Sequence, residues 1–327
     1  MPVPLKSGET LRHRYVIKRI IGHGGMGSIY LAEDLRLKGR VCALKEVEHD
    51  QTLSRSLRQE AQNQFKQEAT VLARLDHPNL PKVSDYFSIG DRDYLVMDYV
   101  PGNDLRTLML MAKHKEKFLD EGEVRSWANQ LADALLYLHG QNPPILHRDI
   151  KPSNLKLTPN GLLKLVDFGL VKIMAPGETT ITIIQGQGTA VYTPLEQYGG
   201  GSIHTDIRSD IYSFGATLYH LLTNTPPPDA RQRFIHPECL KPPRAINPSI
   251  SFQMERAILW AMNLHPDERP QSMAELKDFF IGKSMKRELH PSPIEDVRSA
   301  LKEKEINWLA ISALALTIFG FVASLLY

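Results

Sequence analysis

The chain has 327 residues, which is enough for a two-lobed domain with a large core and one appendage. Its formal net charge of +2 is nearly balanced, so the composition gives no reason to expect nucleic acid as a partner. The two cysteines, Cys42 and Cys239, lie too far apart for a disulfide framework, and they favour a protein of the reducing cytoplasm.

The first elements are predicted strands. Residues 1–14 are polar and contain no apolar run, so we expect an N-terminal extension without a secretory signal. From residue 15 to residue 47 the sequence alternates as β-strands do. A polar stretch, residues 49–62, separates these strands from a predicted helix. The apolar residues of that helix recur at helical spacing at Phe65, Ala69, Leu72 and Leu75.

A glycine-rich segment lies between the first two strands. Gly22, Gly24 and Gly27 match the pattern G-x-G-x-x-G, whose backbone can lie close to phosphates because glycine has no Cβ. Dinucleotide-binding folds use the same pattern, but their glycines open a helix. Residues 28–32 read as a strand instead, which argues against a dinucleotide site.

The rest of the chain changes from strands to helices. Strand-like runs return at residues 83–87 and 94–97, and helical patterns follow, notably at residues 124–139 and 210–222. Several prolines mark residues 226–248 as rich in loops.

Two short motifs in the second half carry the chemistry. HRDIKPSN at residues 147–154 is followed by DFG at residues 167–169, with a hairpin signal, Asn160-Gly161, between them. Phosphoryl transfer from ATP needs one carboxylate to accept the proton of the attacking hydroxyl and another to hold magnesium against the phosphates. Asp149 has the position for the first task and Asp167 for the second.

With these motifs in this order, the chain resembles the protein kinase family from residue 15 to residue 281. Lys151 is typical of serine/threonine kinases, and the glycine-rich segment resembles that of bacterial transmembrane members. The resemblance implies an α+β, two-lobed kinase fold. A small β-rich N-lobe with one main helix would cover about residues 15–97, and a larger helical C-lobe about residues 101–281.

The implied function is signal transduction by a serine/threonine protein kinase that transfers the ATP γ-phosphoryl group to proteins, with Mg²⁺, or Mn²⁺ in its place, as cofactor. The alternative is a membrane-anchored pseudokinase or scaffold that binds nucleotide without catalysis. Pseudokinases usually lack the lysine, the catalytic aspartate or the metal-binding aspartate. This chain keeps the whole set: Lys45, Glu68, Asp149, Asn154 and Asp167.

The resemblance also assigns ATP-binding residues. Lys45 matches the lysine that grips the α- and β-phosphates, and Glu68, rather than Glu60, matches the helical glutamate that pairs with it. Met97 takes the gatekeeper position. Asp104 lies where the family contacts ribose or substrate, although a loop cap explains it equally well. The expected ATP-binding residues are Ile21, Gly22, His23, Gly24, Gly25, Met26, Gly27, Ser28, Ile29, Ala43, Lys45, Glu68, Met97, Asp98, Tyr99 and Val100.

The catalytic roles follow in the same way. The resemblance makes Asp149 the proton acceptor and places Lys151 near the γ-phosphate. Asn154 and Asp167 would bind magnesium. His147 is expected to be a packed structural residue rather than a base.

The activation segment, residues 169–196, is the expected site of regulation. Arg148 lies next to the catalytic aspartate, where a phosphate commonly neutralises such a cation. We therefore expect autophosphorylation at Thr179, Thr180 or Thr182 to order this segment. Thr189 matches a threonine that braces the catalytic residues and has a structural role.

Two positions depart from the family pattern. Pro194-Leu195-Glu196 replaces Ala-Pro-Glu, but Glu196 remains and Arg269 matches its usual buried partner. Lys156 stands where an apolar side chain normally forms the floor under adenine; its methylene groups could lie under the ring. Asp210, by contrast, follows the family pattern and matches the aspartate that anchors the backbone of the catalytic loop.

The C-terminal residues predict a membrane anchor. Residues 308–327 contain no charge, and a helix of this length, rising ~1.5 Å per residue, can cross a hydrocarbon core of ~30 Å. We expect a charged juxtamembrane linker at 282–306 and a single transmembrane helix at 307–327, with the kinase domain in the cytoplasm, where ATP and magnesium are. A buried helix is the alternative. Gly320 and Ser324 would let two such helices pack as a homodimer, although a chance pair of small residues explains them as well.

Overall fold

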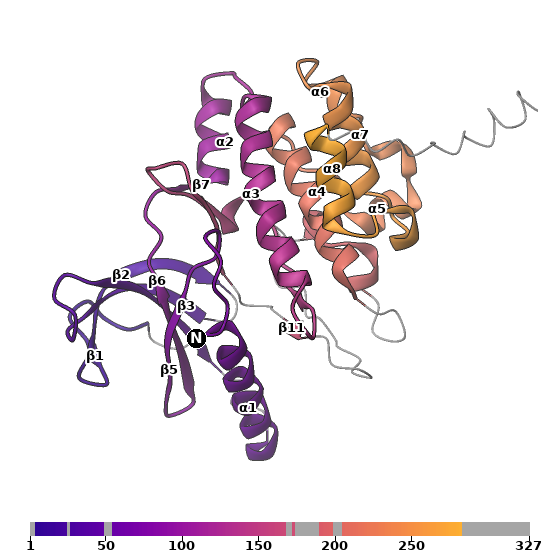
Figure 1. Ribbon diagram of the computed structural model, residues 1–327. Coiled ribbons are helices and arrows are strands. Elements are labelled where there is room, and N and C mark those ends of the chain that lie inside the picture. Colours follow the sequence, from indigo (N-terminus) through magenta and orange to yellow (C-terminus); the bar gives the residue numbers. More distant parts are fainter. Residues whose placement is uncertain are drawn as a thin grey trace, which may run out of the picture. The chain divides into compact units, whose positions relative to one another are not determined.

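The computed structural model describes residues 4–24, 27–48, 54–167, 172–173, 190–198 and 205–282. Within these ranges the chain forms two lobes, a sheet with one long helix beside it and a set of packed helices (Figure 1). The expected two-lobed α+β architecture is therefore confirmed. The predicted linker from residue 283 onward and the predicted transmembrane helix lie outside the described residues.

The N-lobe is a six-stranded antiparallel sheet with the strand order β1-β2-β3-β4-β6-β5. Its strands are β1 (Thr10–Leu11), β2 (Tyr15–Gly24), β3 (Gly27–Asp34), β4 (Val41–Glu48), β5 (Val83–Ile89) and β6 (Arg92–Asp98). Side chains in β3 alternate between buried and partly exposed, as expected for a strand with one face on a core. The core behind that face is aromatic, with Tyr15, Tyr30, Phe87 and Tyr94 buried together.

The predicted N-terminal extension is, where described, part of this lobe. Strand β1 pairs with β2, and Leu11 is buried. Leu5 packs against the same core, and its backbone N–H donates a hydrogen bond to the Tyr30 hydroxyl at 3.1 Å. Two isolated apolar residues in a polar stretch have no periodicity, so the sequence pattern gave no sign of these contacts.

Helix α1 (Arg55–Leu72) also begins earlier than predicted. Its N-cap is Ser54, whose hydroxyl accepts a hydrogen bond from the Leu57 N–H at 3.3 Å. Its first turns are mostly exposed, so they need no apolar stripe, and the polar residues 49–62 concealed this part of the helix.

The C-lobe is built around α3 (Glu121–His139) and α4 (Ile207–Thr223). Helix α4 is buried along almost its whole length because it packs against α3 and also against α7 (Phe252–Ala261). A Cβ at Gly215 would lie 2.8 Å from the Ala261 Cβ, so the close approach of α4 and α7 requires a glycine there. Helix α8 (Met273–Ile281) covers α3 and α7.

The remaining C-lobe elements are short. They are β7 (Asn103–Asp104), α2 (Leu105–His114), β8 (Ile145–Leu146), η1 (Pro152–Asn154), β9 (Leu155–Leu157), β10 (Leu163–Leu165), β11 (Lys172–Ile173), η2 (Ala190–Tyr192), η3 (Leu195–Gln197), α5 (Ala230–Ile235), η4 (Pro237–Cys239), α6 (Pro243–Ile246) and η5 (Pro266–Glu268). Within the described ranges, no helix is both long and apolar enough to span a bilayer.

Candidate active site

The catalytic loop follows the buried strand β8, and a side chain of α4 holds its backbone. Asp210, fully buried on α4, accepts hydrogen bonds from the backbone N–H groups of His147 and Arg148 at 2.9 and 2.8 Å. His139, at the end of α3, donates to the same carboxylate at 2.9 Å. Burial alone would raise the pKa of Asp210, but these donors hold it below its usual value. Asp210 thus makes the anchoring contact that the sequence analysis expected.

Within the described part of the chain, one carboxylate oxygen of Asp149 is held by hydrogen bonds, and the other is buried without a donor. Its Oδ2 accepts hydrogen bonds from Lys151 Nζ at 2.8 Å and from Asn154 Nδ2 at 2.9 Å. The Asn154 amide also donates to the backbone carbonyl of Asp149 at 2.8 Å, which fixes the turn. Among the described residues, the buried Oδ1 of Asp149 has no hydrogen-bond partner. A buried acceptor without a donor fits a group that receives a proton from a substrate.

Lys45 and Asp167 meet between the lobes. Lys45, on β4, donates from Nζ to Asp167 Oδ1 in a close ion pair. Burial would raise the pKa of Asp167, but the ammonium outweighs it and holds the pKa below its usual value. Asp167 has φ of 68°, and Arg148 has φ of 64°. Non-glycine residues rarely adopt this left-handed conformation, and strained backbone of this kind gathers at functional sites.

Glu68, the predicted partner of Lys45, is half-buried on α1. The carboxylate that the structure places against Lys45 is that of Asp167. Glu68 also acts on Arg148, a buried residue of the catalytic loop. Burial lowers the pKa of Arg148, while the charges of Asp210 and Glu68 act in the opposite direction. The Lys45–Glu68 contact therefore stays a prediction.

The N-lobe strands bring the other expected ATP-binding residues to one region. Met97 lies opposite Ala43 in the sheet, and Ile29 lies opposite Lys45. Gly22 and His23 pair with Ile29 and Ser28 across the glycine-rich turn. Ile21, on the same strand, packs against the main core. Gly25 and Met26, at the tip of this turn, lie outside the described residues.

Gly27 shows why this turn needs glycine. It has φ of 142°, and a Cβ there would lie 2.0 Å from the backbone oxygen of Glu46. No other residue fits without moving β4. The hinge continues after Met97 through Asp98 and Tyr99 to the buried Val100.

Lys156, the expected floor of the adenine site, contacts the hinge. It lies on β9, directly opposite Asp104 on β7 and Lys164 on β10. Its ammonium lies 5.7 Å from the centroid of the Tyr99 ring, within reach of a cation–π contact. Burial lowers the pKa of Lys156. Asp104 caps α2 by accepting from the Thr107 N–H at 2.8 Å, so the loop-cap explanation holds for one of its oxygens.

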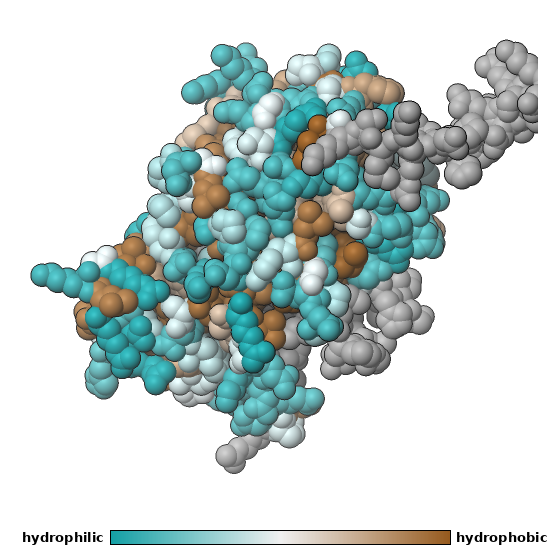
Figure 2. All heavy atoms as spheres, in the orientation of Figure 1, coloured by the Kyte–Doolittle hydropathy of each residue, from teal (hydrophilic) through white to brown (hydrophobic). Residues whose placement is uncertain are grey.

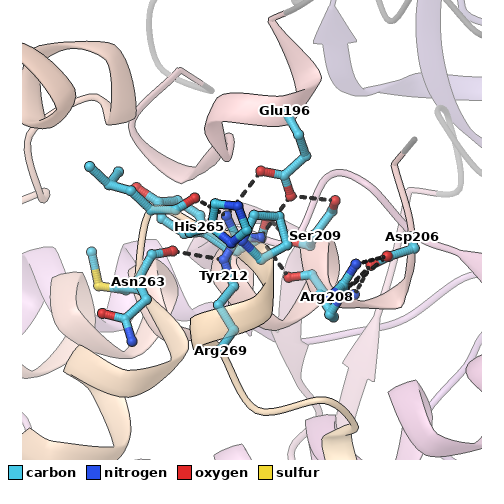
Figure 3. Close-up of polar contacts among 12 residues, drawn as sticks. Glu196, Asp206, Arg208, Ser209, Tyr212, Asn263, His265 and Arg269 are labelled. Carbon is cyan, nitrogen blue, oxygen red and sulfur yellow. Dashed lines mark hydrogen bonds and ion pairs between the residues drawn. The ribbon is translucent and has the colours of Figure 1, made fainter. Parts of the chain in front are cut away.

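The scaffold of the C-lobe rests on Glu196 and Arg269. The guanidinium donates to both carboxylate oxygens, at 2.7 and 2.9 Å, and both side chains are buried. Figure 3 shows Arg269 between Glu196 and Tyr212, with Ser209 donating to the same carboxylate at 2.7 Å. The replacement of Ala-Pro-Glu by Pro194-Leu195-Glu196 therefore leaves this ion pair in place.

The activation segment is largely outside the described residues, and the expectations for Thr179, Thr180, Thr182 and Thr189 fall there. Two contacts at its far end were not anticipated from the sequence. The Tyr192 hydroxyl lies 2.6 Å from His220 Nδ1, and the Tyr192 carbonyl accepts from Ser213 Oγ at 2.8 Å. His139 was missed as well. No periodic or motif signal marks these histidines, because their partners lie far away in the sequence.

The residues available for a metal are oxygen donors. Asn154 has its amide oxygen, since its Nδ2 is used on Asp149, and Asp167 has a second carboxylate oxygen beyond Lys45. Magnesium is usually held by one or two carboxylates together with substrate phosphates, so this donor set fits it. The described residues contain no cluster of three or more His, Cys, Asp or Glu residues that could hold a metal by itself.

Known proteins resemble this chain over the same region. Residues 15–281 match the family described as the protein kinase domain. A probable serine/threonine-protein kinase of Clostridium acetobutylicum is 34% identical over 278 residues, which cover 83% of this chain and 40% of that protein. One from Streptomyces coelicolor is 36% identical over 283 residues, with 84% and 40% covered. The chain therefore spans less than half the length of these two relatives.

Solved structures agree. The kinase domain of Mycobacterium tuberculosis PknI superposes with a TM-score of 0.64 at 28% identity, covering 86% of this chain and 99% of that one. The apo form of PpkA-294 gives a TM-score of 0.66 at 27% identity, with 85% and 99% covered.

Proposed function

The chain belongs to the protein kinase family, and on that premise we propose that it transfers the γ-phosphoryl group of ATP to serine or threonine hydroxyls of proteins. The observation that carries this proposal is the state of Asp149. One carboxylate oxygen is held by Lys151 and Asn154, and the other is buried without a donor among the described residues. A serine or threonine hydroxyl supplies the missing donor.

In the proposed reaction, the substrate hydroxyl donates its proton to Asp149 Oδ1 while its oxygen attacks the γ-phosphorus of ATP. The bond between the γ-phosphorus and the bridging oxygen breaks, ADP leaves with that electron pair, and the proton later passes to solvent. Lys151 lies beside Asp149 and can neutralise charge on the transferred group. Asn154 and Asp167 would hold the magnesium, which would supply positive charge against the phosphates.

The Lys45–Asp167 pair has a second use in this proposal. The two charges neutralise each other in the structure. Nucleotide binding gives each a new partner, because the phosphates attract the ammonium of Lys45 and the divalent cation attracts the carboxylate of Asp167. Asn154 would complete the protein ligands of this cation, which is Mg²⁺ or Mn²⁺. The ion pair keeps the two groups in place until both exchange partners.

Regulation is proposed at the activation segment. Arg148 is buried, and Asp210 and Glu68 offset only part of the cost of burying its charge. A phosphate on Thr179, Thr180 or Thr182 would supply a further anion. Replacement of all three threonines by alanine should therefore lower activity; unchanged activity in that variant argues against the proposal.

Membrane attachment is proposed for residues 307–327, on the strength of their length and lack of charge. This arrangement leaves the kinase domain in the cytoplasm as a single-pass membrane protein. Full-length protein should remain in the membrane fraction after carbonate washing, whereas a chain ending at residue 306 should be released. Release of both proteins by the carbonate wash would contradict the proposed membrane anchor. Crosslinking in the membrane, compared with a Gly320→Leu variant, would test a homodimer through this helix.

The catalytic proposal is tested with full-length protein in mild detergent, labelled ATP and magnesium, and casein or myelin basic protein as acceptor. Lys45→Ala and Asp149→Asn should each remove most of the labelling. Lys38→Ala, an exposed lysine of the same lobe, should have no effect. Equal labelling by the wild type, Lys45→Ala and Asp149→Asn would overturn the catalytic assignment and favour a nucleotide-binding scaffold.

A further inference from the structure

Helix α2 carries two cations beside the catalytic loop. It packs against η1, which holds Asn154, and against α4. Arg106 is in its first turn and Lys113 in its last, seven positions apart, which places both side chains on the same side of the helix. Leu110, between them, is 40% exposed. The three residues form a stripe, hereafter the α2 stripe.

The two cations of the α2 stripe lie near Tyr192 and His220, because Arg106 acts electrostatically on both side chains and Lys113 acts on His220. Tyr192 is buried and hydrogen-bonded to His220, with ring centroids 6.0 Å apart. Burial raises the pKa of Tyr192, and both Arg106 and Asp149 act on it with opposite signs, so both charges lie close to this ring. Arg106 therefore lies near Tyr192, on a helix that packs against η1 of the catalytic loop.

Lys113 lies at the other end of the stripe. Burial, followed by the charges of Lys113 and Arg106, lowers the pKa of His220 to about 4. His220 is thus neutral near pH 7 and adds no charge of its own. The positive charge on this surface comes from the two side chains of α2.

Neither cation has a carboxylate partner among the described residues. Both side chains are exposed, and Lys113 donates a hydrogen bond to the Asn224 carbonyl at 3.3 Å. Asp104, the acid at the start of α2, caps that helix by accepting from the Thr107 N–H. Two exposed cations without a carboxylate partner can take anionic groups from another molecule.

The surroundings favour charge as the basis of recognition. Ser153, between Pro152 and Asn154 in the catalytic loop, carries no negative charge that could attract a basic peptide. The face visible in Figure 2 is largely hydrophilic, with small and separate apolar patches. This face thus offers no broad apolar surface to a peptide, whereas the exposed Arg106 and Lys113 offer charge.

We propose that Arg106 and Lys113 form a subsite for acidic side chains, so that the preferred substrates carry aspartate or glutamate near the serine or threonine to be modified. The proposal rests on the kinase activity proposed above. Seven helical residues span ~10 Å, which is the length of about three residues of an extended peptide. Arg106 would read an acid close to the phosphoacceptor, and Lys113 a second acid about three residues farther away.

The test uses full-length protein and a series of peptides with one threonine in a neutral background. Aspartate is placed at each flanking position in turn, and a matched series carries lysine. For the wild type, kcat/KM should rise about fivefold with aspartate at the best position, the size expected of one exposed ion pair, and should fall with lysine there. High salt should reduce both effects. Phosphoserine at the same position shows whether the subsite accepts any anion.

Charge reversal gives the sharper readout. Arg106→Glu should reverse the preference at the near position, favouring lysine over aspartate, and Lys113→Glu should do so about three residues farther away. The KM for ATP should not change in either variant. Lys115→Glu makes the same charge change at the exposed C-cap of α2 and should leave the preference intact.

The outcomes separate the two proposals. If no peptide or protein is labelled above the level of Asp149→Asn, the proposed kinase activity fails. If the wild type labels acidic, neutral and basic peptides equally well, or if Arg106→Glu keeps the preference of the wild type, the subsite is wrong while the kinase activity stands. A reversal that Lys115→Glu shares would also overturn it, because the effect would then come from net charge.

Discussion

Two ion pairs of this protein are built in opposite ways. Arg269 and Glu196 lie wholly within the C-lobe; their side chains are 0% and 4% exposed, and further hydrogen bonds hold both of them. Lys45 and Asp167 join the two lobes; they are 10% and 31% exposed, and they meet at a residue with a left-handed backbone. In the proposed reaction, the second pair exchanges partners when nucleotide and metal bind, whereas the first pair stays closed.

The burial of each ion pair fits a different role. A buried charge that loses its partner is costly, so the Glu196–Arg269 pair holds the fold and must stay closed. A half-buried pair at a strained position can open at smaller cost, which suits groups that exchange partners when nucleotide binds. Breaking the Lys45–Asp167 pair should therefore lower activity, and breaking the Glu196–Arg269 pair should lower stability.

The largest effect is expected from Asp167→Asn. Without the metal-binding charge, kcat/KM should fall by about 1,000-fold or more, which corresponds to ~4 kcal/mol in the barrier. The thermal midpoint should change little, because the pair contributes little to the fold. Initial rates and thermal unfolding measure the two quantities. Asp76→Asn, an exposed carboxylate, is the control. Retention of a tenth of the activity would contradict the assigned role.

The second effect is expected from Arg269→Ala, which leaves the Glu196 carboxylate buried without its partner. The free energy of unfolding should fall by about 3–5 kcal/mol, measured by urea denaturation. The double variant Glu196→Leu with Arg269→Met should lose less, because no charge remains buried. Arg231→Ala removes an exposed arginine and should cost much less stability. A loss as small as that of the control would show that the pair does not hold the lobe.

Low pH should reduce stability through His220, which forms a polar contact with Tyr192. The pKa of His220 is lowered to about 4, so between its ordinary value of 6.5 and pH 4 the unfolded chain binds a proton that the folded one does not. Stability should therefore fall as the pH falls through this window, by at most ~3 kcal/mol. His220→Gln should remove this part of the pH dependence. The free energies of unfolding of the wild type and His220→Gln are compared at pH 7.5 and at pH 4.5. A difference that is the same at both pH values would refute the predicted role of His220.

The smallest effect is expected at Lys156. It stands directly opposite Lys164 on the neighbouring strand, and like charges in that position are destabilising. Lys156→Leu should therefore raise the free energy of unfolding by about 0.5 kcal/mol, measured by urea denaturation. Lys156→Gln, which removes the charge but keeps a polar side chain, is the matched variant. A loss of stability in both would mean that the contacts of Lys156 with Tyr99 and Asp104 outweigh the repulsion.

The sequence identified most of the site because the site depends on residue type and spacing. The aspartates of the two motifs, Lys151 and Asn154, and the glycines of the first turn could all be named as positions, and the structure brings Asp149, Lys151 and Asn154 together. The two lobes could be predicted as well, since their strand and helix patterns differ. The start of α1 and the role of residues 5–11 could not, because exposed turns and isolated apolar residues carry no periodic signal.

Residue types and their spacing along the chain were enough to name the functional groups of the site: its acids, its lysine and its glycines. Which of these side chains contact one another became clear from the folded structure alone. Asp167 lies against Lys45, His139 reaches Asp210, and α2 brings Arg106 close to the catalytic loop. These partners are separated by many residues along the chain, and their contacts depend on how helices and sheets pack. Packing is set by the whole core, so local patterns cannot reveal it.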